Sequence, residues 1–475
     1  MQQTKNRGPS SRGFTPSDSN ALQWLPFTSG TQQGRAMAIQ ITKLEVQDIR
    51  FPTSDQLDGS DAIHVDPDYS CAYVTLQTNQ PGLEGHGITF TLGRGTELCV
   101  AVIRAFESFV VGQTLESITE DFAGFWHRTC NESQLRWLGP ERGLVHMSVA
   151  GIFNAIWDLY AKVEGKPVWK LLSDMPPEQL VSCIDFHHIT DALTPDEALE
   201  LLRACESTKL ERERELLEIG MPAYTSSAGW MGYTDEYRRE LCQKYLASGF
   251  KHFKMKVGAD LQDDIRRATL IREEIGEDCY LMMDANQVWD VPEAISQMKE
   301  LARFNPLWIE EPTSPDDILG HAAISKAISP IGVATGEAIS NRIMFKQLLQ
   351  SGGMQFCQID SCRVGSINEL LAIMLLARKF EVPVCPHAGG VGLCNYVQHL
   401  SAVNYIAISP SLENVVIEFS DHLHEHFVDE LRVEQARYRL PILPGYSITM
   451  KSESIRDYEY PRGRVWQERP VVGPE

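Results

Sequence analysis

The sequence lacks any hydrophobic run long enough to cross a membrane. No apolar stretch approaches the roughly 18–20 residues that a spanning helix needs, so we expect no membrane-inserted segment. The chain also lacks an excess of positive charge, because its formal net charge is −21. Nucleic acids and anionic membranes are polyanions, so we expect neither of them as a partner.

A C-x-x-C pair is missing as well, although the chain has 11 cysteines. Several of them, such as Cys183, Cys357 and Cys385, fall inside apolar segments and are predicted to be small buried hydrophobic residues. An odd number of cysteines without framework spacing is typical of a reducing compartment and disfavours a disulfide scaffold.

Residues 1–36 have almost no acidic side chains and no apolar periodicity. Four basic residues stand against one acid, Asp18. We predict that the segment is a disordered tail, a transit peptide or sequence upstream of the true start. The scarcity of acids suits a mitochondrial presequence, whereas the prolines of the segment disfavour an amphipathic helix. The expected location of the protein is therefore cytoplasmic or mitochondrial.

A well-patterned region begins at Met37. Three strand-like segments (38–51, 71–78 and 86–93) are followed by helical patterns at 97–112 and 143–165. This order predicts an α+β capping domain over residues 37–172. An insertion is predicted over 173–222. In it, LVSCIDF (180–186) is expected to be a strand and residues 194–220 a polar helical stretch.

The second half of the chain repeats a hydrophobic segment that ends in a polar residue. The gaps between successive polar residues are 28, 26, 27, 23 and 27 residues, starting from Lys256 and continuing through Asp284, Glu310, Glu337, Asp360 and His387. Each gap fits one strand plus one helix, and such units close into a (β/α)8-type barrel with every strand ending on one rim.

We predict this barrel over residues 223–421. Its strands are expected at 223–230, 252–257, 279–285, 306–311, 332–337, 355–360, 382–387 and 413–419. Residues 422–475 contain prolines and aromatics but no further barrel unit, and they are predicted to return to the capping domain.

Three of the rim residues are carboxylates on consecutive strands: Asp284, Glu310 and Glu337. They offer only oxygen ligands, which suits Mg²⁺, and no cysteine stands at an equivalent strand end, which disfavours zinc. The sequence therefore predicts a magnesium site on the rim.

Two groups suited to proton transfer flank the predicted metal site. Lys254 and Lys256 lie two residues apart in one strand and point the same way, into the barrel. Crowding by Lys254 and by the metal is expected to lower the pKa of Lys256 and make it a usable base. On the opposite side of the barrel, Asp360 is expected to orient His387. The two bases can address opposite faces of one carbon, or one can take a proton while the other expels a β-hydroxyl.

These motifs resemble a known family. K-x-K (254–256), D-x-N (284–286), W-I-E-E-P (308–312) and T-G-E (335–337), followed by Asp360 and His387, are similar to the mandelate-racemase branch of the enolase superfamily. Within that branch, the stretches GSDAIHVDPDYS (59–70), LRWLGPERG (135–143) and CPHAGGVGLCNYVQHL (385–400) resemble the L-fuconate dehydratases, including mitochondrial animal homologues. The resemblance implies an enolase-like fold that binds Mg²⁺ and removes a proton α to a carboxylate.

The resemblance also implies roles for individual residues. Lys256 would remove the C2 proton of L-fuconate, and His387, held by Asp360, would protonate the departing 3-hydroxyl. The product would be 2-dehydro-3-deoxy-L-fuconate, with water. Metal ligation falls to Asp284, Glu310 and Glu337. Substrate contacts fall to Gly59, Ser60, Asp61, Tyr69, Lys254, Glu337, His387 and Glu418.

Three alternatives remain open from the sequence. The chain can be a dehydratase of another acid sugar, either an aldonate or an aldarate. It can be a racemase or epimerase that uses the same two bases. It can also be a non-catalytic regulatory or RNA-associated protein, which predicts at least one lost catalytic group. As partners we expect a small acid sugar and further copies of the chain in a homo-oligomer.

Overall fold

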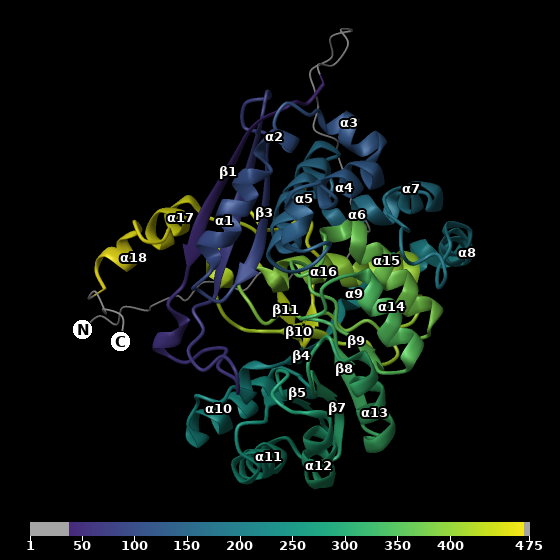
Figure 1. Ribbon diagram of the computed structural model, residues 1–475. Helices are drawn as coiled ribbons and strands as arrows, with labels where there is room; N and C mark the ends of the chain where they lie inside the picture. Colours follow the sequence, from purple (N-terminus) through teal and green to yellow (C-terminus); the bar gives the residue numbers. More distant parts are fainter. Residues whose placement is uncertain (1–37, 470–475) are drawn as a thin grey trace, which may run out of the picture.

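A computed structural model describes residues 38–469 of the chain. The predicted amino-terminal tail, residues 1–36, lies outside these residues. The described part contains an α+β block, drawn in purple and blue, and a barrel, drawn in teal and green (Figure 1). Within residues 38–469, no helix combines the length and the apolar character needed to cross a bilayer.

The α+β block is built on a three-stranded antiparallel meander, with β1 (Ile41–Arg50), β2 (Ser70–Thr78) and β3 (Glu84–Thr91) in that order. The long helix α5 (Gly143–Val163) packs closely on β3. A Cβ at Gly87 would lie 2.3 Å from the carbonyl oxygen of Gly151, so this approach requires glycine in the strand. The other helices of the block are α1 (Thr96–Ala105), α2 (Glu107–Val110), α3 (Leu115–Glu120), α4 (Phe122–Cys130) and α6 (Val168–Asp174).

The prediction of a strand at 180–186 is wrong. Pro177–Ser182 form a helix, α7, with Pro177 in its first turn. Proline has no N–H to lose at that position and its fixed φ favours the helix, so it outweighs the strand-like composition that follows. The helical prediction for 194–220 is confirmed by α8 (Pro195–Cys205) and α9 (Lys209–Ile219), with a short 3₁₀ segment between them.

Parallel strands form the barrel. They are β4 (Met221–Thr225), β5 (His252–Lys256), β6 (Tyr280–Asp284), β7 (Pro306–Glu310), β8 (Gly332–Thr335), β9 (Phe356–Cys357) and β10 (Ile417–Phe419). The ring closes where β10 pairs with β4. The helices outside it are α10 (Asp235–Ala247), α11 (Leu261–Ile275), α12 (Val291–Leu301), α13 (Ile318–Ile328), α14 (Arg342–Ser351), α15 (Ser366–Lys379) and α16 (Leu393–Val403). The predicted fold class is therefore confirmed.

The seventh barrel segment, 382–387, is not the regular strand that was predicted. Among the described residues it makes a single bridge, between Val384 and Cys357. It still lies in the wall, because Cys357 N donates to Pro383 O and Cys385 N donates to Cys357 O. Pro383 and Pro386 have no N–H to donate, which explains why the ladder is incomplete.

The barrel interior is a packed core. Large side chains fill it below the rim, namely Tyr224, Met282, Trp308, Phe356 and Val416 with Ala334 and Cys385. All 11 cysteines are buried and unpaired, as predicted. Because the core fills the barrel, a ligand has room only above the carboxyl ends of the strands.

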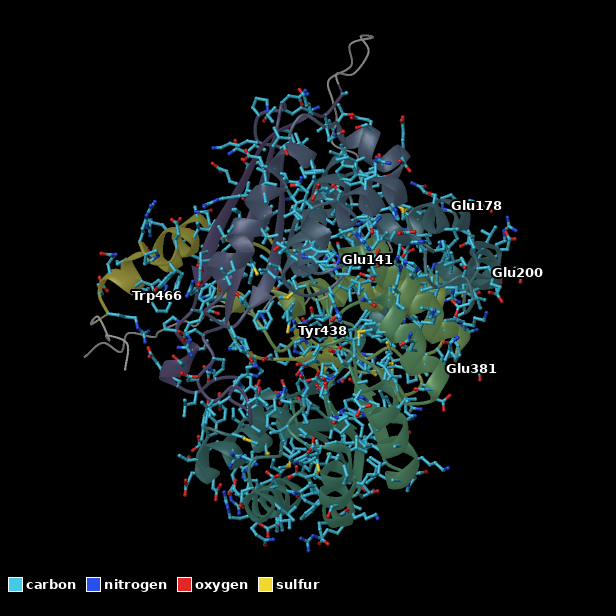
Figure 2. The ribbon with its side chains drawn as sticks, viewed as in Figure 1. Glu141, Glu178, Glu200, Glu381, Tyr438 and Trp466 are labelled. Carbon is cyan, nitrogen blue, oxygen red and sulfur yellow. The ribbon has the colours of Figure 1, made fainter. Side chains whose placement is uncertain are left out.

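The carboxyl-terminal segment contacts both blocks. The hairpin β11 (Val433–Glu434) and β12 (Arg437–Tyr438) pairs antiparallel with β4, and the hydroxyl of Tyr438 donates to the Glu418 carbonyl. Helices α17 (Ser452–Tyr458) and α18 (Arg464–Gln467) lie beside β1 (Figure 1). Trp466, which is labelled in Figure 2, donates from its Nε1 to Arg50 O at 3.1 Å. The domain boundaries given above remain a prediction.

Candidate active site

The rim residues come together at the carboxyl ends of the strands. Lys256 is paired in register with Asp284, and Asp284 with Glu310, across β5, β6 and β7. Glu337 and Asp360 follow β8 and β9, and Glu418 lies within β10. The repeat length seen in the sequence thus produces the predicted cluster, because parallel barrel strands all end on one face.

Three carboxylates form the centre of the cluster. Oxygen atoms of Asp284, Glu310 and Glu337 all lie within 4.8 Å of one another, and the first two side chains are fully buried. Burial and the charge of Asp284 raise the pKa of Glu310 to about 8. That rise is what crowded carboxylates show without a cation between them. The all-oxygen donor set and its mutual repulsion fit a hard divalent cation such as Mg²⁺.

Lys254 lies beneath this centre. Its Nζ is 2.6 Å from Glu310 Oε1, 3.0 Å from Glu418 Oε1 and 3.4 Å from Asp284 Oδ2. Burial works against the ammonium charge, but Glu310 and Glu418 outweigh it and raise the pKa of Lys254. Lys254 therefore neutralises the carboxylates from below and lies behind the residues that line the cavity. A direct contact with a substrate carboxylate remains a prediction.

Lys256 faces the cavity and contacts two side chains of the D-x-N motif. Its Nζ lies 2.6 Å from Asp284 Oδ2 and 2.9 Å from Asn286 Oδ1. Burial lowers the pKa of Lys256, but the Asp284 carboxylate more than offsets it, so the pKa is raised with the protein's own charges alone. The spacing of the sequence does not predict this contact. A dication on Asp284 would draw that carboxylate's charge away from the lysine.

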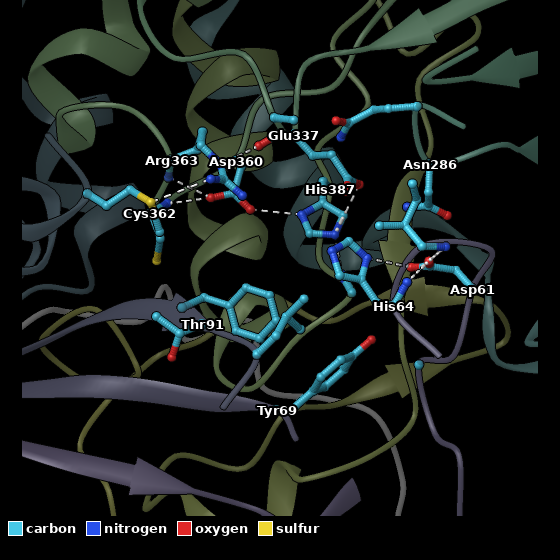
Figure 3. A pocket seen from close by; sticks show the side chains of 18 of the residues that line it. Asp61, His64, Tyr69, Thr91, Asn286, Glu337, Asp360, Cys362, Arg363 and His387 are labelled. Atoms are coloured by element: carbon cyan, nitrogen blue, oxygen red, sulfur yellow. Dashed lines mark hydrogen bonds and ion pairs between the residues drawn. The ribbon is translucent and has the colours of Figure 1, made fainter. Parts of the chain in front are cut away.

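Asp360 and His387 form the predicted pair. Asp360 Oδ2 lies 2.8 Å from His387 Nδ1, while Oδ1 accepts hydrogen bonds from the backbone N–H groups of Cys362 and Arg363 at 2.7 and 2.8 Å (Figure 3). These bonds fix the carboxylate and hence the ring. On its other side, His387 Nε2 lies 3.3 Å from Glu337 Oε2.

The surroundings of His387 favour its charged form. Burial lowers its pKa, but Glu337 and the bond to Asp360 overcome this and raise the pKa to about 10. For the same reason the pKa of Asp360 is lowered despite burial, because the imidazolium and Arg363 stabilise the carboxylate. With the protein's own charges alone, the ring is therefore held in its protonated form.

A cavity of about 690 Å³ lies between this rim and the α+β block. Lys256, Glu337, Asp360, His387 and Glu418 line it from the barrel. From the other block it is lined by residues of the 59–69 loop, of β3 and of helices α1 and α5, among them Gly59, Asp61, His64, Tyr69, Leu98 and Met147. The barrel side of the cavity therefore carries the ionisable residues of the rim, and the opposite side carries a mixture of polar and apolar side chains.

The four loop residues predicted to contact a substrate take different positions. Gly59, Asp61 and Tyr69 line the cavity. Gly59 has a φ of +80°, and a Cβ there would lie 2.2 Å from the Tyr69 hydroxyl, so only glycine fits. Ser60 instead fastens the loop to the barrel, because its Oγ accepts from Gly232 N at 2.8 Å and its carbonyl oxygen accepts from Met231 N at 3.1 Å.

Several cavity residues were missed by the sequence analysis. Asn286, which holds Lys256, is the last residue of the D-x-N motif and was identifiable from it. His64 lies in the quoted stretch GSDAIHVDPDYS but carried no separate signal. Arg363 lies in a loop whose folding no local pattern predicts. Its Nε donates to the Glu337 carbonyl at 2.9 Å.

The sequence and the structure are similar to those of known proteins. Residues 63–173 match the family model "Mandelate racemase / muconate lactonizing enzyme, N-terminal domain", and residues 237–454 match "Enolase C-terminal domain-like". The chain is 57% identical to human mitochondrial enolase superfamily member 1, over 90% of this chain and 97% of that protein. The crystal structure of the human protein superposes with a TM-score of 0.90, over 91% of this chain and 99% of that one.

Two further relatives have names that state an activity. L-galactonate dehydratase of Hypocrea jecorina is 49% identical, over 90% of this chain and 96% of that protein. L-talarate/galactarate dehydratase of Salmonella typhimurium is 27% identical over 80% of each chain. A crystal structure of the latter, with Mg and L-lyxarohydroxamate, has a TM-score of 0.69 at 23% identity, over 90% of this chain and 95% of that one.

Proposed function

The chain belongs to the mandelate racemase/muconate lactonizing enzyme family of the enolase superfamily, and we propose that it is a magnesium-dependent dehydratase of acid sugars. Its relatives include acid-sugar dehydratases at 49% and 27% identity. One observation carries the proposal. Lys256 and His387 reach a single cavity from separate segments of the barrel wall, beside three clustered carboxylates. A non-catalytic scaffold predicts the loss of at least one of these groups, and all are in place.

The proposed reaction breaks two bonds and forms one double bond. Lys256 takes the proton from C2 of the substrate, and the electron pair of that bond forms C2=C3. The 3-hydroxyl leaves with a proton from His387 Nε2 as water. The resulting enol loses its hydroxyl proton and gains a proton at C3, which gives a 2-keto-3-deoxy acid. An epimerase would need His387 to return a proton to C2, whereas here a 3-hydroxyl would occupy that position.

The proposed reaction also needs a metal ion and residues that hold the two proton-transfer groups in place. Asp284, Glu310 and Glu337 would hold Mg²⁺, which would stabilise the negative charge that builds on the substrate carboxylate when the C2 proton leaves. Asn286 holds Lys256 Nζ at 2.9 Å and so keeps it at the position from which it faces the cavity. Asp360 holds the His387 ring and stabilises its charged form.

The substrate we propose is an aldonate of the L-galacto configuration. The sequence resemblance favours L-fuconate, and the relative from Hypocrea jecorina is named for L-galactonate. L-fuconate is 6-deoxy-L-galactonate, so the two acids share every stereocentre from C2 to C5 and differ only in the hydroxyl at C6. Both therefore present the same reacting atoms to Lys256 and His387. The relatives favour the broader class of acid sugars over L-fuconate in particular.

A product assay tests the proposal. The purified protein, with Mg²⁺, is incubated with L-fuconate, L-galactonate, other five- and six-carbon aldonates and several aldarates. Formation of 2-keto acid is followed with a carbonyl reagent. We expect turnover of L-fuconate or L-galactonate, with their C2 and C3 epimers much slower. Turnover of aldarates alone would contradict the aldonate assignment, and a change of configuration at C2 without keto acid would contradict dehydration.

We also propose that the protein is mitochondrial. The support is the name of the human relative together with the excess of basic over acidic residues in segment 1–36. Residues 1–36 fused to a fluorescent reporter should direct it to mitochondria, and a diffuse cytoplasmic signal would contradict this.

A further inference from the structure

A second carboxylate–histidine pair lies on the cavity wall opposite the barrel. Asp61 and His64 belong to the loop between β1 and β2, and both line the cavity. Asp61 Oδ2 lies 3.0 Å from His64 Nδ1. Its Oδ1 accepts from the backbone N–H groups of Ile63 and His64 at 2.8 and 2.6 Å. Three bonds to one buried carboxylate therefore fix the loop and the ring together.

The other ring nitrogen of His64 is directed to the cavity. Within residues 38–469, His64 Nε2 makes no hydrogen bond, and the side chain is 42% exposed although Asp61 is buried. Figure 3 shows the His64 and His387 rings in the same pocket, each held on one side by an aspartate. An anchored imidazole with a free nitrogen in a ligand cavity is arranged to bind rather than to stabilise the fold.

The charges around His64 come from both walls of the cavity. The bond from Asp61 raises the pKa of His64, burial opposes it, and the more distant charges are those of Glu337 and Lys256. The ring thus lies within the electrostatic field of the barrel groups. It can offer an N–H to a hydroxyl oxygen, and it can do so without losing its bond to Asp61.

The position of the reacting carbons decides what His64 can reach. C2 and C3 must lie between Lys256 and His387, at the ends of the barrel strands. Below them the barrel is filled by Tyr224, Met282 and Trp308. The remaining carbons of an acid sugar must therefore extend away from the barrel core, toward the part of the cavity that Asp61 and His64 help to line.

We propose that His64, oriented by Asp61, binds a substrate hydroxyl beyond C4 and thereby selects acid sugars longer than four carbons. This inference rests on the proposed function, because it concerns the same cavity. His64 has no part in the bond-breaking steps; its contact adds binding energy that only a longer substrate can use.

The test compares a substrate that has distal carbons with an analogue that lacks them. The longer acid is L-galactonate or L-fuconate, whichever the wild-type protein turns over faster. The shorter acid is the 2,3,4-trihydroxybutanoate with the same configuration at C2 and C3, measured as a competitive inhibitor. For His64→Leu we expect kcat/KM of the longer acid to fall by about 10- to 100-fold, the usual effect of losing a hydrogen bond that involves a charged group. The inhibition constant of the shorter acid should change by less than about threefold.

Two further variants separate binding from folding. His64→Gln keeps a hydrogen-bonding group at nearly the same reach and should recover part of the loss. Val65→Ala, at the exposed neighbouring position, should match the wild type on both acids. Equal losses for the longer and the shorter acid would overturn the inference and leave the dehydratase intact. A wild-type protein that dehydrates no aldonate would overturn the proposed function and this inference with it.

Discussion

The pair of Asp360 and His387 offers the sharpest prediction, because one atom can be changed without altering the shape of the site. Asp360→Asn keeps an oxygen for the backbone N–H groups of Cys362 and Arg363. It then presents an NH₂ group to His387 Nδ1, where the carboxylate now accepts at 2.8 Å. The imidazolium loses its charged partner, and its pKa must fall.

The size of the fall follows from the contact that is lost. A hydrogen bond to a charged group contributes about 1.5–3 kcal/mol, and one pKa unit corresponds to about 1.36 kcal/mol. We therefore expect the pKa of His387 to drop by about one to two units. In the proposed scheme the ring must be protonated to donate, so activity declines as pH rises through this pKa. The alkaline limb of the pH profile should accordingly move to lower pH by about one to two units.

The measurement is kcat/KM against pH for the wild type, Asp360→Asn and Asp196→Asn, which makes the same change at an exposed position of α8. The displacement of the limb is the quantity to compare, because a cation on Glu337 would shift the wild type and the variant alike. Asp196→Asn should follow the wild type. An Asp360→Asn limb that stays in place would refute the idea that this carboxylate stabilises the imidazolium.

Three other changes test other parts of the account. Glu310→Gln removes one charge from a fully buried carboxylate of the metal site and should lower kcat by about 10³-fold or more. The same change at the exposed Glu300 should leave kcat unchanged. Full activity in excess EDTA would contradict a metal requirement. Gly59→Ala places a methyl group 2.2 Å from the Tyr69 hydroxyl at a φ of +80°, so kcat/KM should fall at least tenfold. Gly82→Ala, whose methyl group meets no neighbour, should stay active, and equal activity of the two variants would show that the loop adapts. A chain that begins at Met37 should keep its activity and melt within a few degrees of the full-length protein, and a large loss of folded yield would show that residues 1–36 are structural.

Much of the catalytic rim was predictable from spacing alone. Residues 23–28 apart recur at the same edge because each repeat is one strand and one helix, and a closed parallel barrel places every such edge on one face. The lysine pair was predictable for a related reason, since residues two apart in a strand share a side. These are consequences of backbone periodicity, which a sequence records directly.

The features that the sequence did not predict depend on local turns and on side-chain contacts. LVSCIDF has the composition of a strand, but Pro177 and its neighbours begin a helix there. Asp284 Oδ2 lies 2.6 Å from Lys256 Nζ and raises the lysine pKa when only the protein's own charges act, and no sequence spacing specifies this distance. Ser60 Oγ accepts a hydrogen bond from Gly232 N, a residue far away in the sequence, and no local pattern predicts this contact.

The central claim is that Lys256 removes the C2 proton while His387 expels the 3-hydroxyl, and isotope exchange tests it most directly. Wild type, Lys256→Ala and His387→Asn are each incubated in D₂O with Mg²⁺ and the preferred aldonate, and NMR follows both the C2 hydrogen and the keto acid. We expect the wild type to form keto acid, His387→Asn to exchange the C2 hydrogen without forming keto acid, and Lys256→Ala to do neither. Exchange by the lysine variant with a silent histidine variant would reverse the two roles. Dehydration at the wild-type rate by both variants would contradict the site itself.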